Sequence, residues 1–276
     1  YEIRNCDWSS DVCSSDLVRR VRAVDLNEKP VRSSYKERLK HGAHAVVDPV
    51  VRRLVWLGVE ADHLTVLGLL LSFLSGLAFF DGQFRIAAVI LIFAGLCDIL
   101  DGQVARISGR QTVYGAFLDS TLDRFAESFV LLGLAGFYAS NLLGLFHKAR
   151  ALVGQVASGE VEPFLATTIL SPDSSPAPEA WLVLAMTSML ALVGSFMVSY
   201  TRARAEGLGL ECKVGFFERP ERIVLLIIAG LAQTFVVMSV ALVVLTVLSF
   251  GTAVQRMVHV YRVTRATSSE PENTEA

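Results

Sequence analysis

Long apolar runs separated by short polar stretches are the main pattern along this chain. Four runs have the length and composition of helices that cross a bilayer: residues 63–80, 84–105, 116–138 and 180–201. A further run, residues 223–254, contains no charged residue and is too long for one span yet short for two. We expect it to break near Gln233-Thr234, with its helices extended to Glu221 and Tyr261. That division gives six spans.

The distribution of arginine decides between odd and even numbers of crossings. Basic residues near the ends of spans favour the cytoplasmic side, and here they would be Arg52, Arg53, Arg106, Arg110, Arg202, Arg204, Arg219, Arg222, Arg256, Arg262 and Arg265. Both termini are then cytoplasmic, which requires an even number of spans. We therefore predict an all-α integral membrane protein, a six-transmembrane-helix bundle in the cell inner (cytoplasmic) membrane. Residues 139–179 would form an external loop, part of it amphipathic helix.

The segments that flank the bundle differ in character from it. Residues 1–17 look like translated sequencing-adapter read-through or a disordered tail, and we exclude them from the predicted fold. Residues 18–60 are expected to be a cytoplasmic segment that ends in an interfacial amphipathic helix, with Trp56 at the level of the headgroups. Residues 61–263 would be the membrane domain and residues 264–276 a disordered tail.

Composition narrows the class of protein further. The chain is 53% hydrophobic and 19% charged, which is more apolar than an ordinary soluble domain. The formal net charge of −2 says little by itself, but the basic residues are distributed by membrane side and are not gathered as a nucleic-acid-binding site would need, so we expect no nucleic-acid partner. Its four cysteines show neither a disulfide framework nor zinc spacing.

Four carboxylates mark the candidate site. Asp98 and Asp101 share one helix face, and Asp119 and Asp123 share another, because side chains three or four residues apart lie on the same side of a helix. The polar stretch between them contains Ser108-Gly109 and predicts the turn of a helical hairpin. The two acidic faces can therefore meet at one membrane surface.

This carboxylate set favours hard divalent cations. Oxygen ligands without His or Cys suit Mg²⁺ or Mn²⁺, and two such ions would offset four negative charges. Gly102, Ala105 and Gly115 leave space for a bulky anionic substrate, and Arg106 supplies a planar donor for phosphate. Capping and helix-dipole effects are the alternative explanation, but they would account for only one or two of the aspartates.

The full pattern D-x2-D-G-x2-A-R-x8-G-x3-D-x3-D resembles the signature of the CDP-alcohol phosphatidyltransferases, and every position is filled here. The resemblance extends from about Asp62 to Arg262. It implies transfer of a phosphatidyl group from CDP-diacylglycerol to a small polar alcohol with release of CMP, two Mg²⁺ or Mn²⁺ ions, and a homodimer.

The resemblance also assigns roles to residues. Asp98, Asp101 and Asp119 would be the first-choice metal ligands, with Asp123 as the catalytic base close to the second ion. The residues expected to bind the nucleotide and the CDP-lipid are Asp62, Thr65, Gly102, Ala105, Arg106, Thr112 and Gly115. Asp62 has the alternative role of a helix cap.

The acceptor alcohol depends on a basic cluster after the fourth span. Arg202, Arg219 and Arg222 suit bidentate phosphate binding, and this segment resembles the phosphatidylinositol-phosphate synthase branch, so we expect an inositol phosphate acceptor. Topological anchoring explains the same charges. Glycerol phosphate and serine are alternative acceptors. A cation or proton transporter that uses intramembrane carboxylates is the alternative from another class, and a noncatalytic relative is a third.

Overall fold

The computed structural model is all α-helical over the residues that it describes, which are 49, 51–56, 58–109, 112–159, 162, 176–212 and 214–268. The predicted N-terminal tail, most of the predicted interfacial segment, Arg110 and Lys213 lie outside these residues. Residues 51–56 are helical, with Val51 buried and Trp56 exposed.

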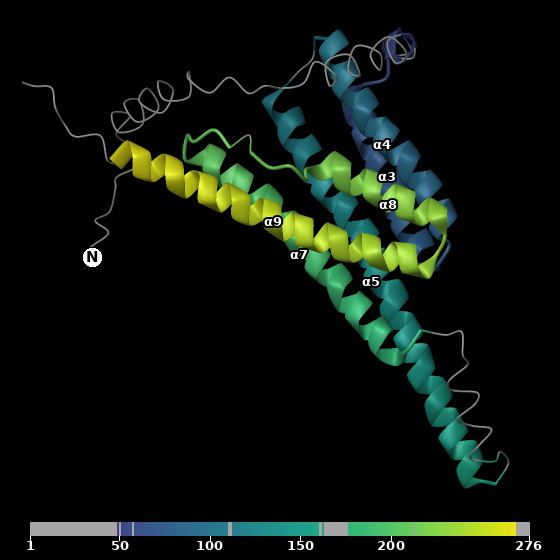
Figure 1. The fold of residues 1–276 in the computed structure, drawn as a ribbon. Helices are drawn as coiled ribbons and strands as arrows, with labels where there is room; N and C mark the ends of the chain where they lie inside the picture. Colours follow the sequence, from purple (N-terminus) through teal and green to yellow (C-terminus); the bar gives the residue numbers. More distant parts are fainter. Residues whose placement is uncertain are drawn as a thin grey trace, which may run out of the picture.

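The chain folds into a bundle of long helices (Figure 1). Their bounds are α3 Ala61–Phe80, α4 Phe84–Ile107, α5 Val113–Ala157, α7 Pro178–Gly207, α8 Arg219–Ala232 and α9 Phe235–Ser268. Four of them, α3, α5, α7 and α9, are long and apolar enough to cross a membrane. The helical membrane character expected from the sequence is therefore confirmed. The count of six spans, which needs α4 and the 14-residue α8 as well, stays a prediction.

Two predicted breaks lie where the sequence places them. α4 ends at Ile107, and Gly109 follows with φ 64°, a left-handed conformation that glycine adopts without strain. Thr112 then caps α5, because its side-chain oxygen accepts a hydrogen bond from the Gly115 N–H at 2.9 Å. The other break separates α8 from α9 at Gln233, which has φ 51°.

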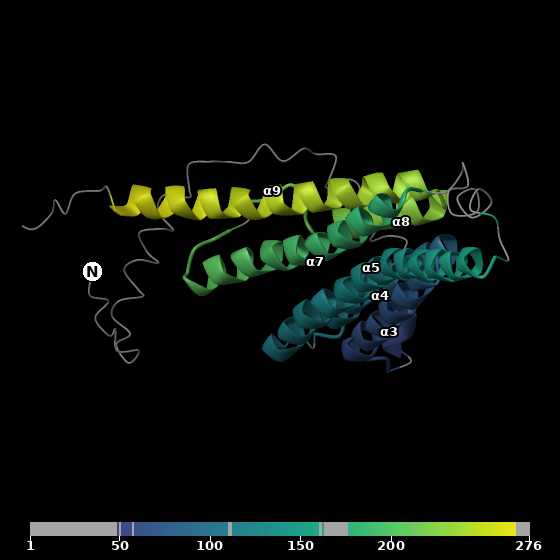
Figure 2. The same cartoon turned by 90° about the horizontal axis from the view of Figure 1, so that it is seen from below.

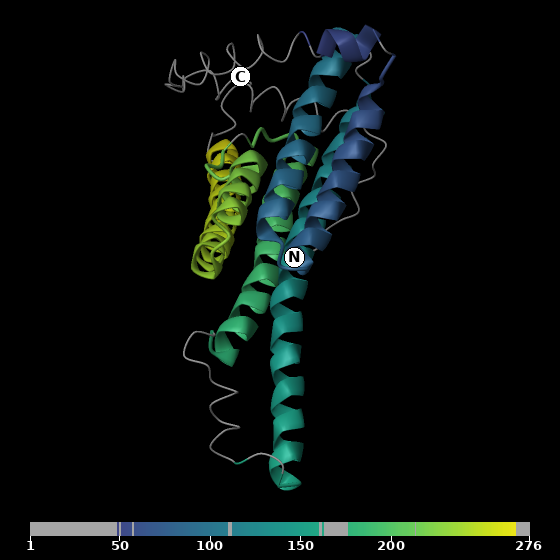
Figure 3. The ribbon, with the colours of Figure 1, turned by 90° about the vertical axis from the view of Figure 1, so that its right-hand side faces the viewer.

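α5 is longer than we predict from the sequence. It continues for 45 residues to Ala157 and extends past the neighbouring helices (Figure 3), where an external loop was expected from residue 139. Residues 139–157 contain no proline, and apolar residues recur there at helical spacing, so nothing in this stretch interrupts the helix. α9 likewise continues to Ser268, into the predicted C-terminal tail.

The helices form two groups that meet along α5 and α7 (Figure 2). α3 packs against α4 and α5, and α7 packs against α5 and α9. α8 packs against α4 and α9, and its first residue, Arg219, contacts Asp98 on α4 and Asp123 on α5. A continuous core that includes Leu131, Leu134 and Leu242 connects the groups.

α3 and α5 touch through their backbones. A Cβ atom added at Gly133 would lie 2.0 Å from the carbonyl oxygen of Gly76, and one added at Gly76 would lie 2.4 Å from that of Phe129. Small residues permit this approach in membrane helices, where van der Waals packing replaces the hydrophobic effect as the force between helices. The contact fixes α3 closely against the helix that carries Asp119 and Asp123.

Candidate active site

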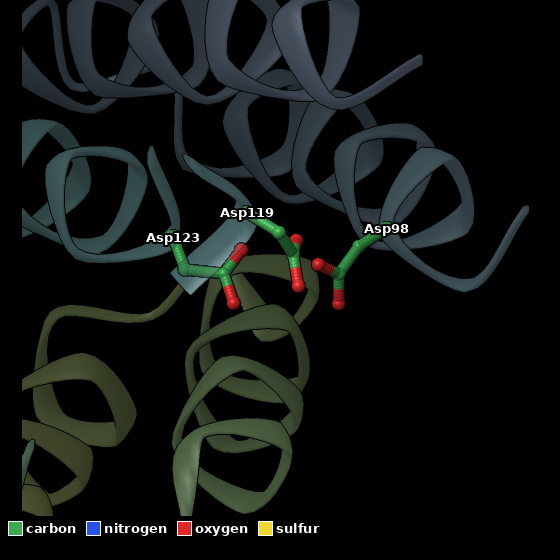
Figure 4. A group of neighbouring side chains, drawn as sticks. All are labelled: Asp98, Asp119 and Asp123. Carbon is green, nitrogen blue, oxygen red and sulfur yellow. The ribbon is translucent and has the colours of Figure 1, made fainter. Parts of the chain in front are cut away.

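Three carboxylates converge at the hairpin end of the bundle. Asp98 comes from α4 and Asp119 and Asp123 come from successive turns of α5, and Figure 4 shows their carboxyl groups close together. One oxygen from each lies within 4.8 Å of the others. The hairpin turn brings the two faces together, and the four-residue spacing on α5 places Asp119 and Asp123 on the same side.

Asp101 lies beside this group but is held differently. It is buried, and its Oδ2 accepts a hydrogen bond from Thr65 Oγ1 at 2.8 Å. This bond joins α3 to α4. Asp101 lines the same cavity as the three converging carboxylates, although it is not one of the group within 4.8 Å. Its predicted role as a metal ligand stays a prediction.

The three carboxylates fit a divalent cation. Asp119 Oδ1 is buried and has no hydrogen-bond partner among the described residues. Ionised carboxylates only accept hydrogen bonds, and three negative charges this close repel one another, which favours the binding of cations among them. An all-oxygen donor set of this kind suits Mg²⁺ or Mn²⁺.

Arg219, at the start of α8, reaches the same carboxylates from the other side. Its Nη1 lies 3.0 Å from Asp98 Oδ1 and 2.5 Å from Asp123 Oδ2. The side chains of this group are partly exposed, so the charges face the cavity and are not sealed in the core. The structure thus brings one predicted acceptor-binding arginine to the predicted metal ligands.

Arg222 forms a second, buried ion pair one turn further along α8. Its Nε and Nη2 donate to the two carboxylate oxygens of Glu127 at 2.6 and 3.0 Å, and its Nη1 donates to the Phe217 carbonyl at 3.4 Å. The side chains of Arg222 and Glu127 are only 2% and 4% exposed. Although Arg222 borders the cavity, this geometry does not favour a direct contact between its guanidinium and an acceptor phosphate.

A cavity of about 600 Å³ opens over the carboxylates. The arginines in its lining are Arg124, Arg202, Arg219, Arg222 and Arg256. Arg202 pairs with Glu206 at 2.8 Å on the same helix, with both side chains about half exposed. An exposed pair of this kind contributes little to stability, so Arg202 can turn to a ligand at small cost.

Arg256, one of the arginines predicted to be cytoplasmic, is buried in the protein. Its Nε donates to the Val214 carbonyl at 2.8 Å and its Nη1 donates to the Val198 carbonyl at 2.6 Å. It therefore joins α9 to α7 and to the segment that leads into α8. Gly215 in that segment has φ 136°, and a Cβ there would lie 3.1 Å from Arg256 Nη2.

The remaining predicted residues lie around the cavity or near helix ends. Gly102 lines the cavity, and its carbonyl accepts a hydrogen bond from Arg106 Nε at 2.8 Å. Asp62 is exposed in the first turn of α3, whose N-cap residue is Glu60, so Asp62 does not have the alternative role of a cap. Ala105 is partly buried near the end of α4.

Sequence reasoning missed Glu127 and the burial of Arg256. A signal for Glu127 was present, because Asp119, Asp123 and Glu127 recur every four residues within an apolar stretch. The rule that marks an ionisable residue inside a membrane segment as functional applied to it as well. No comparable pattern distinguished Arg256 from the arginines that were assigned to membrane sidedness.

A helical membrane bundle with a cavity lined by carboxylates and arginines suits a membrane enzyme that binds metal ions and phosphate groups. Residues 59–263 match the family model of the CDP-alcohol phosphatidyltransferases. The chain belongs to this family, as the aspartate signature predicted. Membership in a family of transferases sets aside the transporter alternative.

Relatives that are similar in sequence are named as synthases of inositol phosphate lipids. The archaetidylinositol phosphate synthase of Methanothermobacter thermautotrophicus is 32% identical over 219 residues, which cover 78% of this chain and 89% of that protein. The phosphatidylinositol phosphate synthase of Mycobacterium tuberculosis is 31% identical, over 77% of this chain and 84% of that protein.

Solved structures show the same fold. The crystal structure of the Mycobacterium tuberculosis phosphatidylinositol phosphate synthase with CDP-DAG bound has a TM-score of 0.59 and 27% identity, and the match covers 84% of this chain and 98% of that chain. The same enzyme in complex with manganese and citrate has a TM-score of 0.58 and 30% identity, over 83% and 91%.

Proposed function

We propose that this protein transfers the phosphatidyl group of CDP-diacylglycerol to an inositol phosphate and releases CMP. The observation that carries this proposal is the meeting of three carboxylate oxygens within 4.8 Å, beside Arg219, in one cavity. The two relatives are both named for an inositol phosphate lipid, and this supports the choice of acceptor.

The proposal includes the setting of the enzyme. The protein acts as a homodimer of six-span subunits in the cell inner membrane, with both termini and the cavity on the cytoplasmic side. The arginine distribution along the sequence supports this orientation.

Asp98, Asp101, Asp119 and Asp123 are the residues that would hold two divalent ions, either Mg²⁺ or Mn²⁺. Bound there, the ions supply Lewis-acid stabilisation of the charge on the diphosphate. The orphaned Oδ1 of Asp119 and the manganese complex of the Mycobacterium tuberculosis enzyme support this assignment.

Donor binding involves residues near the ends of α3, α4 and α5. Thr65 donates a hydrogen bond to Asp101, and Gly102 follows Asp101 and lines the cavity, so both would lie close to the diphosphate. The other members of the proposed CDP-lipid site are Asp62, Ala105, Arg106, Thr112 and Gly115. Arg106 is exposed, so its guanidinium can leave the Gly102 carbonyl for a phosphate oxygen.

In the proposed reaction, an acceptor hydroxyl oxygen attacks the phosphorus of the phosphatidyl group. Asp123 takes the hydroxyl proton, the new phosphorus–oxygen bond forms, and the bond from that phosphorus to the oxygen of the departing CMP breaks. Arg202 and Arg219 bind the acceptor's phosphate. This phosphate carries about two negative charges into an acidic site, so it needs positively charged partners of its own.

One assay tests the proposal. The purified protein in lipid nanodiscs is incubated with CDP-diacylglycerol, Mn²⁺ or Mg²⁺, and separately with inositol phosphate, free inositol, glycerol phosphate or serine, and CMP release is measured. We expect the highest kcat/KM with inositol phosphate. A better rate with glycerol phosphate or serine would reject the acceptor but keep the reaction class, and no CMP release with any alcohol would reject the proposed activity.

A further inference from the structure

Two acid–arginine pairs connect α5 to α8 one above the other. Asp123 and Glu127 are four residues apart on α5, and Arg219 and Arg222 are three residues apart on α8, so each set lies on one helix face. The pairs are Asp123–Arg219 at 2.5 Å and Glu127–Arg222 at 2.6 Å.

The two pairs differ in their access to the cavity. The side chains of the Asp123–Arg219 pair are 21% and 23% exposed, whereas those of the Glu127–Arg222 pair are 4% and 2% exposed. All three guanidinium nitrogens of Arg222 have a partner, two on Glu127 and one on the Phe217 carbonyl. The buried pair therefore holds both α8 and the segment that leads into it.

We propose that Glu127 and Arg222 are positioning residues that act through Arg219. Their bidentate pair fixes the height and rotation of α8 relative to α5, and this presents the Arg219 guanidinium to the carboxylates and to the acceptor. The proposal rests on the proposed function only for the identity of the acceptor that Arg219 contacts.

Two other roles for this pair predict that the two single variants change the KM for the acceptor in opposite directions. If Arg222 bound the acceptor phosphate directly, or if the pair acted only through net charge, removing the charge of Glu127 would strengthen acceptor binding and removing that of Arg222 would weaken it. With a pure net-charge effect, the double neutral variant would resemble the wild type, whereas with direct phosphate binding it would still lack the contact made by Arg222. For a positioning pair, both single changes weaken acceptor binding, because either one releases α8.

The test compares Glu127→Gln, Arg222→Gln and the double variant, with Arg222→Lys as a milder change that keeps the charge. We expect each neutral single variant to raise the KM for inositol phosphate by about tenfold to a hundredfold, since small displacements of positioned groups have effects of this size. The KM for CDP-diacylglycerol should change by less than about twofold, and the double variant should be no worse than the poorer single variant, because the partners act as a unit. Arg265→Gln, at an exposed position near the end of α9, is the control and should behave as the wild type.

A fall in acceptor KM for Glu127→Gln, or a double variant with wild-type KM, would overturn the proposal. So would a loss of kcat with both KM values unchanged, which is the result of a smaller folded fraction. A second readout does not depend on the acceptor: spin labels at the lipid-exposed positions Leu132 on α5 and Ile228 on α8, in a background without native cysteines, report the distance between the helices. We expect Glu127→Gln to shift or broaden that distance distribution. An unchanged distribution would reject positioning even if inositol phosphate proved the wrong acceptor.

Discussion

The two halves of the bundle contribute opposite charges to one cavity. α4 and α5 provide the aspartates and Glu127, whereas α7, α8 and α9 provide Arg202, Arg219, Arg222 and Arg256. Three lining residues are exceptions. The guanidinium of Arg124 on α5 donates to the backbone of its own helix at Ser120, and the basic half includes Glu206 and Glu218, which pair with Arg202 and Arg256. This division separates two tasks, since the acidic half suits the metal and the donor and the basic half suits the acceptor.

The halves also differ in how they are held. α3 and α5 are in backbone contact at Gly76 and Gly133, and Thr65 connects α3 to Asp101 on α4. α8 is joined to α5 through the long side chains of Arg219 and Arg222. The acidic half is therefore built for fixed geometry. The basic half is held by side-chain contacts, and one of its arginines, Arg219, pairs directly with Asp98 and Asp123.

The largest effect is expected from a change in the acidic half. Asp119→Asn should lower CMP release by more than about a hundredfold, because metal stabilisation of the transition state is worth several kcal/mol. It should also weaken Mn²⁺ binding, measured by electron paramagnetic resonance. The same loss should follow addition of excess chelator to the wild type. Undiminished CMP release in chelator would contradict the assignment of the acidic half to a metal.

A change at Asp123 should separate chemistry from binding within the same half. Asp123→Asn should lower kcat by about 10²- to 10⁴-fold, the usual contribution of a general base, while the affinity for CDP-diacylglycerol is largely retained. Single-turnover kinetics with a separate measurement of donor binding checks this. A variant with normal turnover would place the base elsewhere.

In the basic half, the expected effect is smaller and falls on the acceptor. Arg219→Ala should raise the KM for inositol phosphate by about tenfold to a hundredfold, since a hydrogen bond to a charged group contributes about 1.5–3 kcal/mol. The KM for CDP-diacylglycerol should change far less. Arg204→Ala is the matched control, because Arg204 is exposed on α7 and is not among the residues that line the cavity. Equal shifts in the two Michaelis constants would argue against separate tasks for the halves.

The smallest effect on the activity of each folded molecule is expected from a change at the backbone contact between α3 and α5. Gly133→Ala places a Cβ about where the Gly76 carbonyl oxygen lies, and overpacking of this kind typically costs about 1–3 kcal/mol of stability. We expect a lower Tm in detergent. Gly144→Ala, where a Cβ would meet no atom within 4 Å, should not lower it. An unchanged Tm for Gly133→Ala would show that α3 and α5 can separate freely.

Much of the acidic half could be predicted from sequence because its signals are local. Asp98, Asp119 and Asp123 follow helical spacing, and Ser108-Gly109 interrupts an apolar run, so the hairpin and the convergence of carboxylates require only helix geometry. The break at Gln233 also followed from the length of an apolar run compared with the thickness of a bilayer.

The basic half depends on contacts between distant residues, which no local pattern contains. Arg222 and Glu127 are 95 residues apart in sequence, and Arg256 binds the carbonyls of Val198 and Val214 from 58 and 42 residues away. A count of arginines at one membrane side cannot distinguish a buried structural guanidinium from one that faces a ligand. The length of α5 was missed for another reason: the third apolar run was expected to end near Tyr138, and the whole connection 139–179 was interpreted as an external loop, although nothing in residues 139–157 ends the helix.

The backbone contact with α5 at Gly76 is the point about which α3 would turn if its tilt changed. Thr65 lies eleven residues before it, a lever arm of about 16 Å along the helix axis. A rotation of α3 by only about 5° around this point would move Thr65 by roughly 1.4 Å at that rise per residue, enough to break its 2.8 Å hydrogen bond to Asp101. A lipid environment that changes the tilt of α3 would therefore remove the hydrogen bond that holds Asp101. Bilayer thickness should then affect the activity of this enzyme through the hydroxyl group of Thr65.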